Sequence, residues 1–140
     1  MVNFMNKKKF RFWLILTLVW LVVIFGHSAM PATLSRQESL GIFGWLQSLF
    51  PWLTHSMLRK FGHLAEFAIL GIFLTGAFWR HGKFKLYKPL GTALFVALCD
   101  ETLQLFVPGR SGEIRDVWID FAGALCGILL MRLIFRCKKK

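Results

Sequence analysis

Acidic residues inside otherwise apolar stretches are the most informative feature of this sequence. Four of its seven acidic side chains lie in such stretches: Glu66, Asp100, Glu101 and Asp120. A charged side chain near the centre of a bilayer costs about 2.5–3.5 kcal/mol on insertion scales, so such residues usually face partners and mark function. These carboxylates are therefore the first candidates for binding or acid–base chemistry.

Within each stretch the polar residues are three or four positions apart, a spacing that places them on one face of a helix. His63 lies three residues before Glu66, and Glu101 lies three residues before Gln104. All of them fall just beneath the same membrane surface, so we expect three helices to form one outward-facing polar pocket. The candidate binding residues, which include one loop arginine, are Arg59, His63, Glu66, Glu101, Gln104, Arg110, Asp116 and Asp120.

Several chemistries are open to this set. His63 or Glu101 could act as a general acid or base, but no activated Ser or Cys nucleophile is visible beside them, which disfavours an enzyme. A His63–Glu66 pair that only ties helices together is the simplest alternative. His63, Glu66, Glu101 and Asp120 are residue types that can bind a metal, but they lack the closely spaced ligand pairs of typical metal sites. Neither a metal nor another cofactor is therefore expected. Asp100 faces about 100° away from Glu101 and is interpreted as a group that either supports the site residues or pairs helices.

The composition is that of an integral membrane protein. Hydrophobic residues make up 56% of the chain, compared with about 45–50% in soluble domains. So high a hydrophobic content excludes intrinsic disorder. The net charge of +11 comes from Lys and Arg clusters between apolar runs. There is no basic and aromatic stripe, so nucleic-acid binding is not expected. Three cysteines without a CxxC pattern predict no disulfide framework.

A helix needs about 20 mostly apolar residues to cross a bilayer. Four stretches meet this requirement, and a shorter one at 40–53 is typical of a helix that lies in the interface. The predicted fold is an all-α integral membrane protein with a single domain over residues 1–140. The expected spans are 12–30, 61–79, 90–107 and 117–135.

The distribution of positive charge predicts the orientation. With the N-terminus inside, thirteen of the eighteen Lys and Arg residues fall in inner segments, as expected for cytoplasmic loops. Both chain ends should therefore face the cytoplasm. The alternative is a cleaved signal peptide with its basic region at 7–9 and its cleavage site near Ser28. A retained span is favoured because it gives an even number of crossings.

Three motifs resemble those of the VanZ-like family. They are RKFGHLAEF at 59–67, DETLQLFVPGR at 100–110 and DVWIDFAG at 116–123, in the family's order and with similar gaps. Many relatives have Tyr where Phe67 stands and His where Leu103 stands, so this chain lacks that hydroxyl and that imidazole. The resemblance implies a small bacterial protein of the cytoplasmic membrane. The family's namesake lowers susceptibility to teicoplanin, a lipid-tailed glycopeptide.

Together, the residues and the resemblance favour a non-enzymatic envelope protein. Its pocket would bind an anionic lipid, a lipid-linked cell-wall precursor or a lipoglycopeptide, with Arg110 among the donors to phosphate or carboxylate. One alternative is a membrane enzyme that acts on a lipid headgroup through His63 or Glu101. Another is a proton-linked transporter with Glu66, Glu101 and Asp120 as its relay. The transporter is disfavoured because no buried acid continues the path toward the cytoplasmic side.

Thiol labelling in intact cells tests the orientation. Single cysteines are introduced as Ser35→Cys, Ser111→Cys and Lys83→Cys in a cysteine-free background. A membrane-impermeant maleimide should label the first two variants, because their segments face outward, and should leave the third unlabelled until the cells are lysed. Labelling of Lys83→Cys in intact cells would overturn the orientation.

Overall fold

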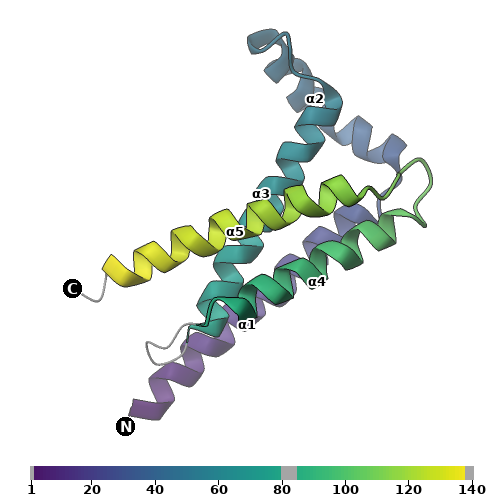
Figure 1. Ribbon diagram of the computed structural model, residues 1–140. Helices are drawn as coiled ribbons and strands as arrows, with labels where there is room; N and C mark the ends of the chain where they lie inside the picture. Colours follow the sequence, from purple (N-terminus) through teal and green to yellow (C-terminus); the bar gives the residue numbers. More distant parts are fainter. Residues whose placement is uncertain (1, 80–84, 138–140) are drawn as a thin grey trace.

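A computed structural model describes residues 2–79 and 85–137, and the regular structure in these ranges is entirely helical. The all-α prediction is confirmed for this part of the chain. Lys83, the inner labelling position, lies outside the described residues. Figure 1 shows the helices in chain order: α1 (Val2–Ser28), α2 (Ala32–Leu49), α3 (His55–Phe78), α4 (Tyr87–Gln104) and α5 (Ile114–Cys137).

Two helices begin well before the apolar stretches that predicted them. α1 starts at Val2 and not at residue 12, because the Lys and Arg residues of its first turns are good helix formers. α3 starts at His55 and not at residue 61. There the Thr54 side chain accepts a hydrogen bond from the Met57 N–H at 3.2 Å and caps the first turn.

The prediction was also inaccurate for the bounds of α2 and α4. The helix expected at 40–53 begins directly after Pro31 and ends at Leu49, because Pro51 cannot continue it. α4 ends at Gln104 and not at residue 107. The chain turns immediately after this point and forms the loop that leads to α5.

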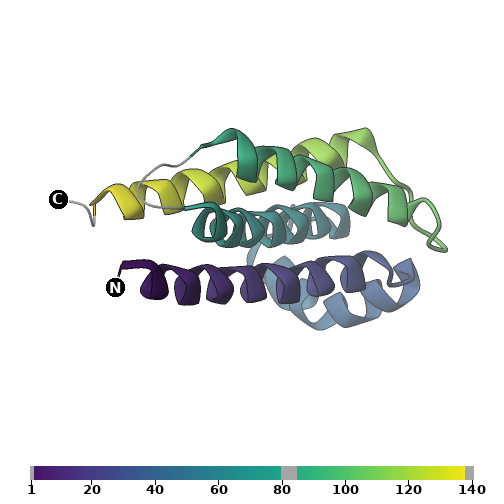
Figure 2. The ribbon, with the colours of Figure 1, turned by 90° about the horizontal axis from the view of Figure 1, so that it is seen from below.

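α1, α3, α4 and α5 form a bundle of alternating direction. α1 begins and α5 ends at one end of the bundle, while α1 and α4 end and α3 and α5 begin at the opposite end, here called the loop end (Figure 1). In Figure 2, α3 lies between α1 on one side and α4 and α5 on the other. α2 lies at the loop end, where the Phe43 ring packs 4.8 Å from the His55 ring.

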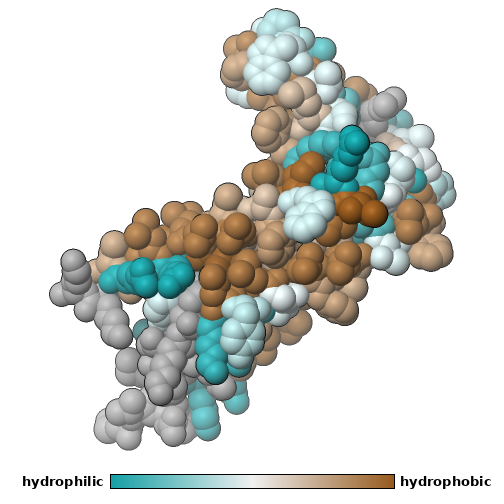
Figure 3. All heavy atoms as spheres, in the orientation of Figure 1, coloured by the Kyte–Doolittle hydropathy of each residue, from teal (hydrophilic) through white to brown (hydrophobic). Residues whose placement is uncertain are grey.

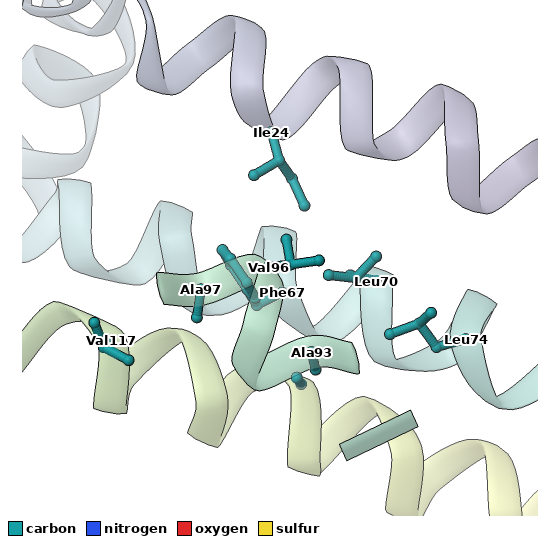
Figure 4. Packing of buried hydrophobic residues seen from close by; sticks show 9 residues of the cluster. Ile24, Phe67, Leu70, Leu74, Ala93, Val96, Ala97 and Val117 are labelled. Carbon is teal, nitrogen blue, oxygen red and sulfur yellow. The ribbon is translucent and has the colours of Figure 1, made fainter. Parts of the chain in front are cut away.

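The apolar core lies where these helices meet α3. Phe67 and Leu70 of α3 are fully buried at its centre, with Ile24 of α1 packed on one side. Small residues of α4 bring that helix close on the other side (Figure 4). The core cluster consists of Ile24, Phe67, Leu70, Leu74, Ala93, Val96, Ala97, Val117 and Ala124.

α3 and α5 approach each other closely, and glycine makes this approach possible. A Cβ atom at Gly127 would lie 1.9 Å from the carbonyl oxygen of Ala68, and one at Gly123 would lie 2.2 Å from that of Leu64. Neither backbone oxygen can move without moving the helix. The GxxxG step of α5 is therefore a packing device that lets two backbones touch.

Three of the helices are long and apolar enough to cross a membrane: Lys7–Ser28, His55–Phe78 and Ile114–Cys137. The predicted third crossing does not meet this criterion, because α4 is long enough with 18 residues but carries three charged side chains, Lys88, Asp100 and Glu101. Apolar side chains cover the face of α4 and α5 seen in Figure 3, and hydrophilic ones gather toward the ends of the bundle. A large exposed apolar surface of this kind is typical of a protein embedded in lipid.

The variant Gly127→Ala tests the helix contact. We expect it to lower the free energy of unfolding by about 2–3 kcal/mol, because the added methyl overpacks the helix contact. The measurement is unfolding in mixed detergent and sodium dodecyl sulfate. Gly91→Ala is the matched control, since nothing lies within 4 Å of a Cβ at that position. Equal stability of the two variants would contradict the assigned contact.

Candidate functional site

A buried polar cluster lies just inside the loop end, where α3, α4 and α5 converge. It consists of His63, Asp100, Glu101 and Asp120, all buried, each with a nitrogen or oxygen atom within 4.8 Å of those of the others. The His63 Nδ1 atom lies 3.5 Å from Asp120 Oδ1 and 3.9 Å from Asp100 Oδ2. Three of the sequence-predicted site residues are thus brought together across three helices.

Gln104 holds two of these carboxylates from within α4. Its amide nitrogen donates to Asp100 Oδ2 at 3.0 Å and to Glu101 Oε1 at 3.2 Å. The second Glu101 oxygen accepts the backbone N–H of Glu113 at 2.9 Å. Glu101 is therefore anchored at both oxygens, by its own helix and by the first residues of the chain leading into α5.

Asp100 was expected only to support the site residues or to pair helices, and this interpretation is wrong. Its side chain is fully buried and lies in the cluster beside Glu101. The reason is that α4 contacts α1, α3 and α5, so much of its circumference faces protein. Two residues 100° apart on such a helix can both point inward.

A cavity of about 910 Å³ opens beside the cluster at the loop end, a volume typical of small-molecule sites. The last turn of α1, the first turns of α2 and α3, and the loop before α5 line it. Arg59, His63, Glu66 and Arg110 are the predicted site residues on its wall. His63 therefore belongs both to the cavity wall and to the buried cluster.

Glu66 lies apart from the buried cluster. Its carboxylate meets His27 Nδ1 of α1 at 2.5 Å, and its backbone carbonyl accepts the indole N–H of Trp20 at 2.8 Å. Sequence reasoning missed His27, although it is the only ionisable residue in the apolar part of α1. The expected grouping of Glu66 with Glu101 and Gln104 is replaced by an α1–α3 contact.

Asp116 is the acceptor for the basic residues at the start of α3. Its carboxylate lies 3.5 Å from the Lys60 ammonium and 3.9 Å from the Arg59 guanidinium, and the residue is 4% exposed. This ion-pair group lies beside the cavity, because Arg59 belongs to both. The pairing leaves Asp120, one turn further along α5, without a basic partner from this group.

Arg110 folds back over the end of α1. The preceding Pro108–Gly109 pair forms a tight turn, with a hydrogen bond from Arg110 N–H to Val107 O and a φ of 76° at Gly109. The Arg110 guanidinium donates to the carbonyl oxygens of Met30 and His27, each at 2.9 Å. These carbonyls lie in the last turn of α1 and just after it, and that of His27 also accepts the Met30 N–H at 3.2 Å.

The Arg110 guanidinium is affected by its burial and by the neighbouring Arg59. Burial lowers the pKa of Arg110, and the positive charge of Arg59 lowers it further. Like charges on one wall are stabilised by an anion between or beside them, and guanidinium groups bind phosphate and carboxylate in a bidentate manner. The cavity is therefore suited to an anionic group.

Comparison with known proteins bears on this site. A family model described as VanZ/LLP1 matches residues 12–136, nearly the whole chain. This match confirms the resemblance inferred from the three motifs. No match to a curated protein or to a solved structure was found.

Substitutions of Arg110 test its two carbonyl contacts. Both Arg110→Ala and Arg110→Lys should lower the free energy of unfolding by about 1–3 kcal/mol, because hydrogen bonds to a charged group are lost and an ammonium cannot reproduce the planar fork. Arg115→Ala is the control, since that side chain is exposed. Parent-like unfolding of Arg110→Lys would show that charge alone suffices at this position.

Proposed function

The chain belongs to the VanZ/LLP1 family, and we propose that it binds the anionic headgroup of an amphiphile in the loop-end cavity. The headgroup would be the phosphate of a membrane lipid or of a lipid-linked cell-wall precursor. The observation that carries this proposal is the pair of arginines, Arg59 and Arg110, on the wall of a cavity that opens at the end of an apolar bundle.

The charges of the lining favour an anion. Glu66 is the one carboxylate among the described lining residues, and His27 already pairs with it. Arg59 is held only loosely, 3.9 Å from Asp116, and its side chain is 33% exposed. It can therefore turn toward a ligand while Lys60 continues to balance Asp116.

Apolar residues beside the cavity could hold the acyl chains. Phe61, on the cavity wall, is 55% exposed. Leu34 and Met57 are exposed as well, and each is a sequence neighbour of residues that line the cavity. A lipid whose phosphate meets the arginines could lay its tails along these side chains without leaving the bilayer. This combination of an ionic end and an apolar side favours an amphiphile over a free ion.

We further propose four crossings with both chain ends in the cytoplasm, α4 being the fourth crossing helix beside α1, α3 and α5. The alternation of helix directions supports this topology. The loop end then faces the outer leaflet of the bacterial cytoplasmic membrane, where lipid-linked precursors and lipoglycopeptides are met. Reduced susceptibility to teicoplanin would follow if the drug or its target occupied the same cavity.

A second candidate function is a membrane enzyme that acts on the bound headgroup. The observation in its favour is the position of His63, which lies on the cavity wall and within 4 Å of two buried carboxylates. Water would be the nucleophile, with His63 as its base. A transporter has less support, because α3 and α5 beyond the cluster bury apolar residues such as Leu70, Leu74 and Ile128.

Lipid binding by the purified protein tests the proposal. In detergent, fluorescent phosphatidylglycerol should bind more tightly than fluorescent phosphatidylcholine, and unlabelled teicoplanin should compete for the same site. Arg59→Gln should weaken phosphatidylglycerol binding about tenfold, which is about 1.4 kcal/mol, because a guanidinium–phosphate contact is lost. Unfolding measurements establish that the variant remains folded.

Arg132→Gln is the matched control, since it removes one guanidinium from α5 near the end opposite the cavity. Its affinity for phosphatidylglycerol should equal that of the parent. An equal loss of affinity in both variants would mean that only the net charge of the protein matters. Equal binding of the two lipids by the parent would contradict a site for an anionic headgroup.

A further inference from the structure

The carboxyl groups of the buried polar cluster have no Lys or Arg side chain within 4 Å in the described part of the chain. Three carboxylates and one imidazole come together there, and anion binding in the cavity makes no use of the carboxylates. We propose that His63, Asp100, Glu101 and Asp120 bind a divalent transition-metal cation of the Zn²⁺ or Mn²⁺ kind. This inference stands apart from lipid binding and can hold or fail without it.

The spacing of the candidate ligand atoms suits one ion. Zn²⁺ lies about 2.0–2.2 Å from imidazole nitrogen and carboxylate oxygen, so ligands on different sides of it are roughly 3–4.5 Å apart. Here His63 Nδ1 lies 3.5 Å from Asp120 Oδ1 and 3.9 Å from Asp100 Oδ2. One atom from each of the four residues lies within 4.8 Å of the others, so a small contraction around the ion is sufficient.

Buried polar atoms without partners point to a missing ligand. Among the described residues, both Asp120 carboxylate oxygens, Asp100 Oδ1 and His63 Nδ1 have no hydrogen-bond partner. Asp100 and Asp120 are 0% exposed and His63 is 9% exposed. Burying a charge without pairing it is costly, and buried charges are normally paired or coordinate metals.

Three basic side chains at the loop end contact groups outside the cluster. Lys60 and Arg59 lie against Asp116, and the Arg110 guanidinium donates to two backbone carbonyls. None of these three side chains makes an ion pair of 4 Å or less with a cluster carboxylate in the described part of the chain. A cation supplied from outside would neutralise the charge that these residues leave uncompensated.

Further contacts hold the carboxylates in position for an ion. The Gln104 amide donates to Asp100 and Glu101, and the backbone N–H of Glu113 donates to Glu101 Oε2. Hydrogen bonds of this kind orient metal ligands and are a regular feature of metal sites. Each of these hydrogen bonds uses one side of one carboxylate oxygen. The other side of that oxygen, or the second oxygen of the carboxylate, stays available to an ion.

The site has an entry path and a preference among metals. His63 lines the cavity, so an ion that enters the cavity reaches a cluster ligand at once. One imidazole with three carboxylates suits Zn²⁺ or Mn²⁺, whereas Ca²⁺ and Mg²⁺ favour ligand sets made of oxygen alone. Sequence spacing could not reveal this set of ligands, because they come from three helices. One of them, Asp100, was also not among the site residues expected from the sequence.

Metal analysis of the purified protein tests the proposal. After treatment with a chelator, the protein in detergent is dialysed against micromolar Zn²⁺ or Mn²⁺ and its metal content is measured by mass spectrometry. The parent should retain close to one ion per chain. Asp120→Asn should weaken binding at least tenfold, because it replaces a charged ligand with a neutral amide of the same shape.

Glu113→Gln is the matched control. It removes the charge of an exposed side chain and keeps the backbone N–H that donates to Glu101. Its metal content should equal that of the parent. A second measurement needs no variant: pulsed electron paramagnetic resonance of bound Mn²⁺ should reveal coupling to one imidazole nitrogen. A parent that retains neither ion, or bound Mn²⁺ without nitrogen coupling, overturns the proposal.

Discussion

The close approach of α3 to α5 is the contact on which the site depends. The carbonyl oxygens of Leu64 and Ala68 occupy the space that side chains at Gly123 and Gly127 would need. His63 directly precedes Leu64, and Asp120 lies one turn before Gly123, so the same contact holds imidazole and carboxylate 3.5 Å apart. Any larger residue at the two glycines would separate the helices and, with them, the members of the cluster.

The charges at the loop end are sorted by the elements that carry them. Asp116 faces the basic residues of α3, Glu66 pairs with His27 of α1, and the arginine of the loop closes the end of α1. This sorting leaves a cationic cavity beside a buried anionic cluster, with His63 in both. An anionic headgroup in the cavity and a cation in the cluster would each supply the charge that its own environment lacks.

Local patterns predicted the helical class, because spacing along one element determines it. The GxxxG step of α5 and the Pro–Gly pair before Arg110 are local signals of the same kind. Asp100 was misplaced because its burial depends on how many helices surround α4, which its own sequence does not encode. His27 was missed because its partner, Glu66, lies 39 residues away on another helix. The metal hypothesis had no support from spacing for the same reason, since its ligands meet only after three helices have packed.

An experimental structure of the protein, purified from its own membrane in mild detergent, tests the central claim most directly. The claim is that the loop-end cavity holds the anionic end of an amphiphile. The account predicts density for a phosphate-bearing lipid in the cavity, with its phosphate within hydrogen-bond distance of Arg59 or Arg110. A well-resolved cavity that holds only water, with lipid bound elsewhere on the bundle, would contradict it.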